Sequence, residues 1–149
     1  MKNQLLNRIC FIALLTVLFS SNCHSQGITR EQARMIAESV LKNYLTVTGS
    51  KESGKTTINK IDTIKYEYKI IGYVFYLNPG GYVIISGFRE MSPIFSMSGI
   101  GKYNTNIENI ETVLKPAFIQ KYITINSHSV SKTSVDRNRN MWNQHLASK

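Results

Sequence analysis

The pattern of hydrophobic and polar residues predicts a β-sheet in the middle of the chain. After the N-terminal segment, the densest hydrophobic stretch runs from Tyr73 to Gly101. Within it, Tyr73 to Leu77 and Tyr82 to Ile85 are rich in aromatic and β-branched residues, and Asn78 to Gly81 supplies the proline and glycines of a tight turn. This predicts a hairpin, which a third run from Pro93 to Met97 can join before glycines interrupt it.

A further strand is predicted ahead of this hairpin. From Thr57 to Ile71 the sequence alternates, with Ile64, Tyr66, Tyr68 and Ile70 on one face and charged residues on the other. We therefore expect about four antiparallel strands, in an arrangement that can leave one face of the sheet in solvent while helix covers the other.

Two helices are predicted to flank the sheet, which makes the expected fold α+β. Thr29 and Gln32 have the spacing of a capping box. The helix that follows has a hydrophobic stripe at helical spacing, formed by Ala33, Ile36, Ala37, Val40, Leu41, Tyr44 and Leu45. A second stripe begins at Ile107 after the sheet, and Pro116 is expected either to kink that helix or to start a new one.

The first 25 residues are predicted to be an export signal. Lys2 and Arg8 form a basic start, and Ile9 to Phe19 is a hydrophobic run too short to span a bilayer. Two processing routes stay open: cleavage after Ser25, or retention of Cys23 as the lipid-bearing cysteine of a bacterial lipoprotein. Both predict an exported protein, periplasmic or secreted, whose only membrane contact would be a lipid anchor.

We expect residues 26–125 to form one folded domain and residues 126–149 to form a flexible polar tail, because the tail shows almost no hydrophobic periodicity. The formal charge is +9, and removing Lys2 and Arg8 leaves +7, which suggests an acidic partner or an anionic envelope surface. Nucleic acid is a poor candidate, because no clustered basic run with interleaved aromatics occurs in an exported chain.

Composition also argues against catalysis. The only cysteines are Cys10 and Cys23, and neither is left as a free thiol after processing. A cysteine nucleophile, a disulfide and a thiolate metal site are therefore excluded from the mature chain. Glu108 and Glu111 share a helical face, but no histidine lies four residues from either. We expect neither an enzyme nor a metal or cofactor site.

The segment from Gly49 to Thr56 matches the phosphate-binding pattern GxxxxGK[ST] letter for letter. A true P-loop follows a strand and opens a helix, whose N-terminal amides hold the phosphates. Here a predicted helix comes before the segment and a predicted strand comes after it. We interpret the segment as a polar linker and expect no nucleotide partner.

The central strands resemble a known family. Tyr73 to Gly87, followed by Ser92 to Tyr103, is similar to the propeptide of streptopain-like cysteine peptidases and to the free-standing Spi-type inhibitors that share its fold. The shared pattern is an aromatic strand, a glycine turn, a strand that ends in Ser-Gly, and a proline-led strand. The resemblance extends from about Ile28 to Ile123, and Phe88 stands where the family usually has Asp.

The resemblance implies an inhibitor that occludes a papain-like active-site cleft. In these propeptides an Asn just before the post-sheet helix is inserted near the cleft and displaces the catalytic His. Ile107 to Ile110 aligns with that segment, which makes Asn109 the leading inhibitory residue and Ile107, Glu108 and Ile110 its neighbours. A neutral amide can donate and accept hydrogen bonds without burying a charge. Asn109 could also cap the helix or lie exposed in its first turn, and these roles are not exclusive.

Met141 to Gln144 resembles a W-x-Q segment near the start of the peptidase domain in this family. Since the chain ends five residues later, we expect a free-standing inhibitor that acts on a separate streptopain-like cysteine peptidase. Two alternatives stay open. One is a truncated zymogen remnant, and the other is a non-inhibitory envelope binding module that has kept the propeptide fold.

Overall fold

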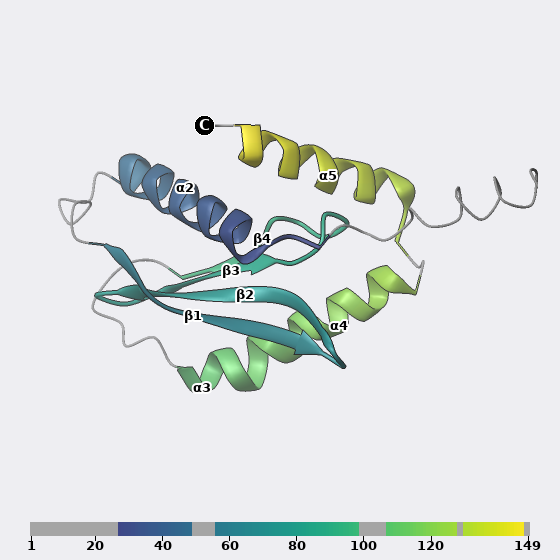
Figure 1. The fold of residues 1–149 in the computed structure, drawn as a ribbon, viewed down its shortest axis with the longest axis horizontal. Coiled ribbons are helices and arrows are strands. Elements are labelled where there is room, and N and C mark those ends of the chain that lie inside the picture. Colours follow the sequence, from purple (N-terminus) through teal and green to yellow (C-terminus); the bar gives the residue numbers. More distant parts are fainter. Residues whose placement is uncertain (1–26, 49–55, 99–106, 128–129, 148–149) are drawn as a thin grey trace, which may run out of the picture.

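The computed structural model describes residues 27–48, 56–98, 107–127 and 130–147. One helix precedes a sheet and further helices follow it (Figure 1). The elements are α2 (Arg30–Thr48), β1 (Thr57–Tyr66), β2 (Lys69–Asn78), β3 (Tyr82–Ser86), β4 (Ile94–Met97), α3 (Ile107–Asn109), the π-helical turn η1 (Ile110–Leu114), α4 (Lys115–Asn126) and α5 (Lys132–Ala147). The four strands are antiparallel neighbours in the order β1-β2-β3-β4. The predicted α+β class is confirmed.

Helices cover both faces of the sheet, with α2 and α5 on one side and α3 to α4 on the other (Figure 1). Side chains of β2 alternate between the two layers: Tyr73, Phe75 and Leu77 face α2, whereas Val74 and Tyr76 face α4. The expectation that one face could stay in solvent is therefore wrong. Strands buried on both faces have nearly continuous hydrophobic sequences, and the stretch from Ile71 to Leu77 has this property.

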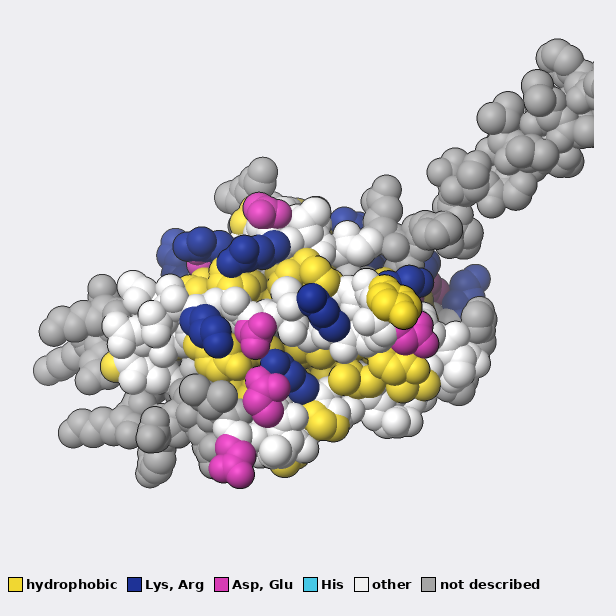
Figure 2. Space-filling view, turned by 60° about the horizontal axis from the view of Figure 1, so that its bottom comes forward, with side chains coloured by type: hydrophobic (Ala, Val, Ile, Leu, Met, Phe, Trp, Pro, Cys, Tyr) yellow, Lys and Arg dark blue, Asp and Glu magenta, His cyan; other side chains and the backbone are white. Residues whose placement is uncertain are grey.

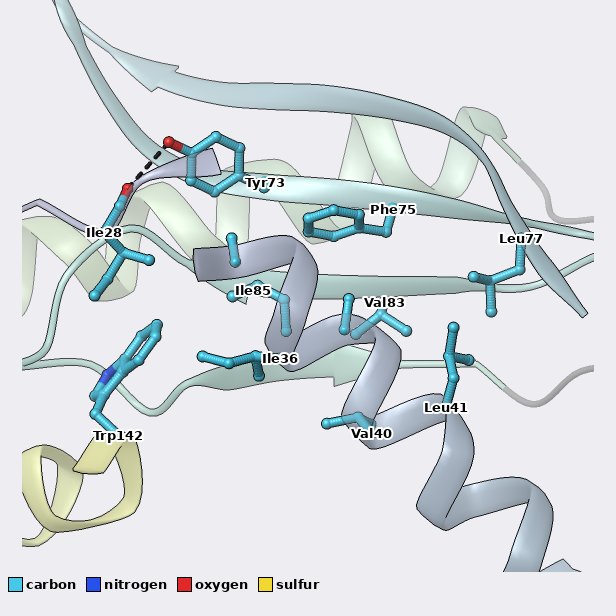
Figure 3. Close-up of a cluster of buried hydrophobic side chains, with 12 residues drawn as sticks. Ile28, Ile36, Val40, Leu41, Tyr73, Phe75, Leu77, Val83, Ile85 and Trp142 are labelled. Carbon is cyan, nitrogen blue, oxygen red and sulfur yellow. Dashed lines mark hydrogen bonds between the residues drawn. The ribbon is translucent and has the colours of Figure 1, made fainter. Parts of the chain in front are cut away.

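The N-terminal helix matches its prediction closely. The Thr29 N–H donates to Gln32 Oε1 at 3.0 Å, and the Gln32 N–H donates to Thr29 Oγ1 at 3.2 Å, which is the reciprocal pair of a capping box. The apolar stripe is buried against β2 and β3. Figure 3 shows Ile36, Val40 and Leu41 of this stripe pointing toward strand residues such as Phe75 and Val83.

The first two strands differ from the prediction, because the chain turns at Glu67 and Tyr68. Glu67 has a positive φ of 53°, and β2 begins at Lys69 instead of after Ile71. Ile64 is buried and Tyr66 contacts the ring of Tyr122, but Tyr68 is 103% exposed at the tip of the hairpin. The alternation continued through a turn, so it could not show where the strand ended.

The predicted turn between β2 and β3 is confirmed. The Leu77 N–H donates to the Gly81 carbonyl at 3.0 Å, which closes the loop around Pro79. Gly81 has a φ of 104°, a conformation that glycine adopts without steric cost. Beyond the turn, Tyr82 pairs with the end of β4 through Ser98, whose N–H donates to the Tyr82 carbonyl at 3.0 Å.

Residues 132–147 are not a flexible tail, which corrects the prediction for 126–149. They form α5, and Trp142 of this helix has no exposed surface. Its indole Nε1–H donates to the Met91 carbonyl at 2.8 Å, and Asn138 Nδ2 donates to the Glu90 carbonyl at 2.6 Å. Trp142 points into the cluster that α2 shares with β2 and β3 (Figure 3). A mainly polar helix with one large buried side chain has little hydrophobic periodicity, so its sequence resembled a tail.

The predicted export signal, including Cys10 and Cys23, lies outside the described residues. Among the helices that the structure does describe, none is both long enough and apolar enough to cross a membrane.

Candidate functional site

The segment that carries the candidate residues forms one continuous helical unit of α3, η1 and α4. Pro116 has no N–H to donate to a preceding carbonyl, and its ring would clash in a regular α-helix. The chain widens into a π-turn just before it, in which the Lys115 N–H donates to the Ile110 carbonyl. Pro116 then occupies the first turn of α4, where a missing N–H has no cost. The helical unit therefore continues past Pro116 because one wider, π-helical turn precedes it.

The structure places the four predicted site residues in different environments. Glu108 and Asn109 are exposed, and Asn109 has helical dihedrals with no capping hydrogen bond from its side chain. Ile107 begins α3. Ile110 is completely buried among residues such as Phe118 and Tyr122, so its predicted role as a contact residue is wrong. Ile110 anchors the segment, and Asn109 is held at the surface next to that anchor.

The element α3, whose last residue is Asn109, lies at the end of the sheet that also contains the turn between β2 and β3 (Figure 1). Asn78 and Pro79 of that turn are exposed, and Ser98 at the end of β4 is bonded to Tyr82 beside it. The predicted contribution of the loop from Gly99 to Asn106 lies outside the described residues. We call this end of the sheet the rim. Among its described residues, Asn78, Ser98 and Asn109 carry uncharged polar groups and Glu108 carries a carboxylate.

Lys115 links the helical unit to the edge strand of the sheet. Its Nζ donates to Glu111 Oε1 at 2.6 Å and to Asp62 Oδ2 of β1 at 3.2 Å. Its side chain is only 15% exposed, whereas both carboxylates are partly in solvent. Acidic and basic side chains are interspersed across the middle of this face in Figure 2. The lysine was not singled out from sequence, because its partner Asp62 is 53 residues away.

Opposing effects set the pKa values of this cluster. Burial raises the pKa of Asp62, but the hydrogen bond from the Thr63 N–H and the ammonium of Lys115 outweigh it, so the pKa of Asp62 lies below its usual value. Burial lowers the pKa of Lys115, but its bonds to Glu111 and Asp62 outweigh burial and raise this pKa. Asp62 and Lys115 are therefore both charged over the neutral range, and their ion pair links the helical unit to β1.

Replacing Lys115 with methionine is expected to lower the free energy of unfolding by about 0.5–1.5 kcal/mol at pH 7, because two partly exposed carboxylates lose their shared cation. A lowered pKa of Asp62 stabilises the fold above the unfolded-state value, and this contribution disappears as pH falls through the folded-state value. The raised pKa of Lys115 stabilises the fold until pH rises past it. Urea unfolding of both proteins from pH 2 to 8 tests this.

The matched control for this substitution is Arg34→Met in the exposed pair of Arg34 with Glu38, whose atoms lie 2.9 Å apart on α2. This change should cost only about 0.2–0.5 kcal/mol. Equal losses for the two variants, or a Lys115→Met loss that persists unchanged at pH 2, would contradict a structural role for the Lys115 cluster.

The described residues contain no group of three or more His, Cys, Asp and Glu side chains that could hold a metal ion. The segment from Gly49 to Thr56 lies mainly outside the described residues, but its neighbours are placed: α2 ends at Thr48 and β1 begins at Thr57. This order is the reverse of a P-loop, in which helix N-terminal amides follow the loop and bind phosphate. The arrangement supports the interpretation of a linker.

Comparison with family models gives a match to the Spi protease inhibitor family over residues 25–124. The match covers α2, the whole sheet and nearly all of α4. The chain belongs to the Spi protease inhibitor family. Comparison with curated proteins and with solved structures finds no match.

Membership of the Spi family confirms the resemblance seen in the central strands, and it implies a protease as the partner. The family match ends at residue 124, whereas the fold does not, since α5 adds Trp142 to the cluster beneath α2. In this Spi-family chain the helix after the matched segment is thus part of the folded unit. The isolated Met141-Trp142 pair in a polar region was the one sequence signal that could have indicated this.

Proposed function

We propose that this protein inhibits a streptopain-like cysteine peptidase by docking the rim of its sheet, with Asn109, across the active-site cleft. The single observation that supports this best is the setting of Asn109. Its amide is exposed and makes no capping bond, on a segment anchored by the fully buried Ile110. A neutral amide fixed in this way can replace hydrogen bonds in a cleft at little desolvation cost, because it carries no charge.

Rigid support favours the same role. The helical unit is fixed on one side by Ile110 and Phe118 in the core and on the other by the bonds of Lys115 to β1. A contact residue held before binding loses little conformational entropy when the complex forms. The protein supplies no catalytic group in this proposal and acts only by binding.

The proposal includes export. The predicted export signal in residues 1–25 supports a location outside the cytoplasm, where the inhibitor would meet a secreted or periplasmic peptidase. If Cys23 is lipidated, the inhibitor is held at a membrane surface; if cleavage follows Ser25, it is released. Mass spectrometry of the protein from its native cells distinguishes the two by the N-terminal residue and the mass of the lipid.

The test is an inhibition assay with a purified streptopain-like cysteine peptidase and a peptide substrate. The expected result is inhibition at sub-micromolar concentration, which is the strength of a specific interface of standard size. A serine peptidase serves as the control and should be unaffected. Absence of inhibition, together with absence of any peptidase in a pull-down from the native secretome, would instead support a binding module that has kept the fold without the activity.

A further inference from the structure

One exposed stripe along the helical unit that contains Asn109 carries no charge. Its exposed residues recur at spacings of three and four, and the list from the N-terminal end is Asn109, Thr112, Val113, Pro116, Ala117 and Gln120. We call these six residues the neutral stripe. They span eleven helical steps, a length of about 16 Å at the rise of an α-helix. Val113 is 55% exposed, which is a large fraction for a valine.

The other two long helices are different. The outward face of α2 includes Arg34, Glu38 and Lys42, and the outward face of α5 includes Lys132, Asp136 and Arg137. Charges on these faces are typical of surfaces that stay in water. The neutral stripe therefore differs from the outward faces of the other helices, in a chain whose formal charge is +9.

The fold keeps neighbouring charges off the neutral stripe. Lys115 and Glu111 belong to the same helical unit, but their side chains are bonded to each other and, through Lys115, to Asp62 on the side of β1. Glu108 flanks the stripe at its N-terminal end, and Lys121 is the exposed cation of α4 nearest its C-terminal end. Depletion of charge in the centre with charge at the rim is the composition of a protein interface.

We propose that the neutral stripe is a second part of the docking surface, which continues from Asn109 along η1 and α4 and packs against an uncharged wall of the target peptidase beside its cleft. This inference rests on the proposed function, because the inhibitor family supplies the partner. Asn109 is at one end of the stripe, so one rigid helix presents both the polar contact and the apolar one. In this arrangement Val113 is the residue whose burial adds most apolar contact area.

The experiment compares two exposed valines on different helices. Val113→Arg introduces a charge into the neutral stripe, and Val47→Arg introduces the same charge on α2, where Val47 is 86% exposed. We expect Val113→Arg to raise the inhibition constant against the streptopain-like peptidase by about 10-fold or more, the effect of disturbing a buried interface residue. Val47→Arg should change it by less than about 2-fold. Thermal unfolding of both variants checks that each keeps its fold.

Ala117→Arg supplies a second position on the stripe in case Val113→Arg does not fold, and the same rise is expected. The outcomes separate the two proposals. If Asn109→Ala weakens inhibition and both stripe variants inhibit like the wild type, the neutral stripe is not a contact surface, and the proposed function stands. If the wild type does not inhibit the peptidase, the proposed function fails and the stripe loses its assigned partner. An equal rise in the inhibition constant for Val47→Arg would show that any added positive charge weakens inhibition, and it would also contradict the proposal that the neutral stripe is a contact surface.

Discussion

Trp142→Ala is expected to lower the free energy of unfolding by about 3–5 kcal/mol, a large part of the stability of a domain of this size. Trp142 has no exposed surface and contributes to the cluster formed by α2, β2 and β3. The truncation removes its apolar contacts and also leaves the Met91 carbonyl without the indole donor at 2.8 Å. Urea unfolding followed by circular dichroism measures the loss.

Two further variants help to interpret this loss of stability: one tests the hydrogen bond of Trp142 and the other is a surface control. Trp142→Phe keeps most of the buried volume and loses the hydrogen bond, so it should cost about 1–3 kcal/mol. Asn143→Ala changes an exposed neighbour on α5 and should stay within about 0.5 kcal/mol of the wild type. Wild-type stability in Trp142→Ala would mean that α5 does not hold its place on the domain and that the original prediction of a tail was right.

Asn109→Ala is expected to weaken inhibition of a streptopain-like cysteine peptidase by about 1–4 kcal/mol, the range of an interface hot spot. The side chain is exposed and makes no capping bond, so its removal should leave the fold unchanged. The loss therefore appears in the inhibition constant and not in the melting temperature. Asn109→Asp should weaken inhibition as well, because it would bury a charged carboxylate in the complex at a position that holds a neutral amide in the wild type.

Asn140→Ala is the matched control, since Asn140 is an exposed asparagine on α5 at a different face of the molecule. It should inhibit like the wild type. If Asn109→Ala keeps full inhibition and full stability, Asn109 is only an exposed helix residue. The contact would then be sought in the loops around Pro79 or Gly99 at the same end of the sheet.

Local signals made much of the fold predictable. The capping box of Thr29 and Gln32, the apolar stripe of α2 and the Pro-Gly-Gly turn each depend on residues close in sequence, and each is confirmed. The family resemblance in the central strands is confirmed by the match to the Spi protease inhibitor family over residues 25–124. The candidate site was located through that resemblance, and the exposure of Asn109 is compatible with it.

Long-range packing decided the rest. Ile110 was grouped with Asn109 because it is adjacent in sequence, yet neighbouring helical residues point in different directions, and only the packed core shows that Ile110 faces inward. The ion cluster of Lys115 depends on Asp62, which no local pattern connects to it.

By itself, the sequence determined the class of fold, the order of the first helix, the sheet and the helix after it, and the family, because periodicity, turn residues and caps act over a few residues. The tertiary structure alone decided that both faces of the sheet are covered and that a polar C-terminal segment is a helix fixed by Trp142. It also decided that the helix passes Pro116 through a π-turn. These features depend on burial between distant segments, which outweighs weak local preferences only once the chain has packed.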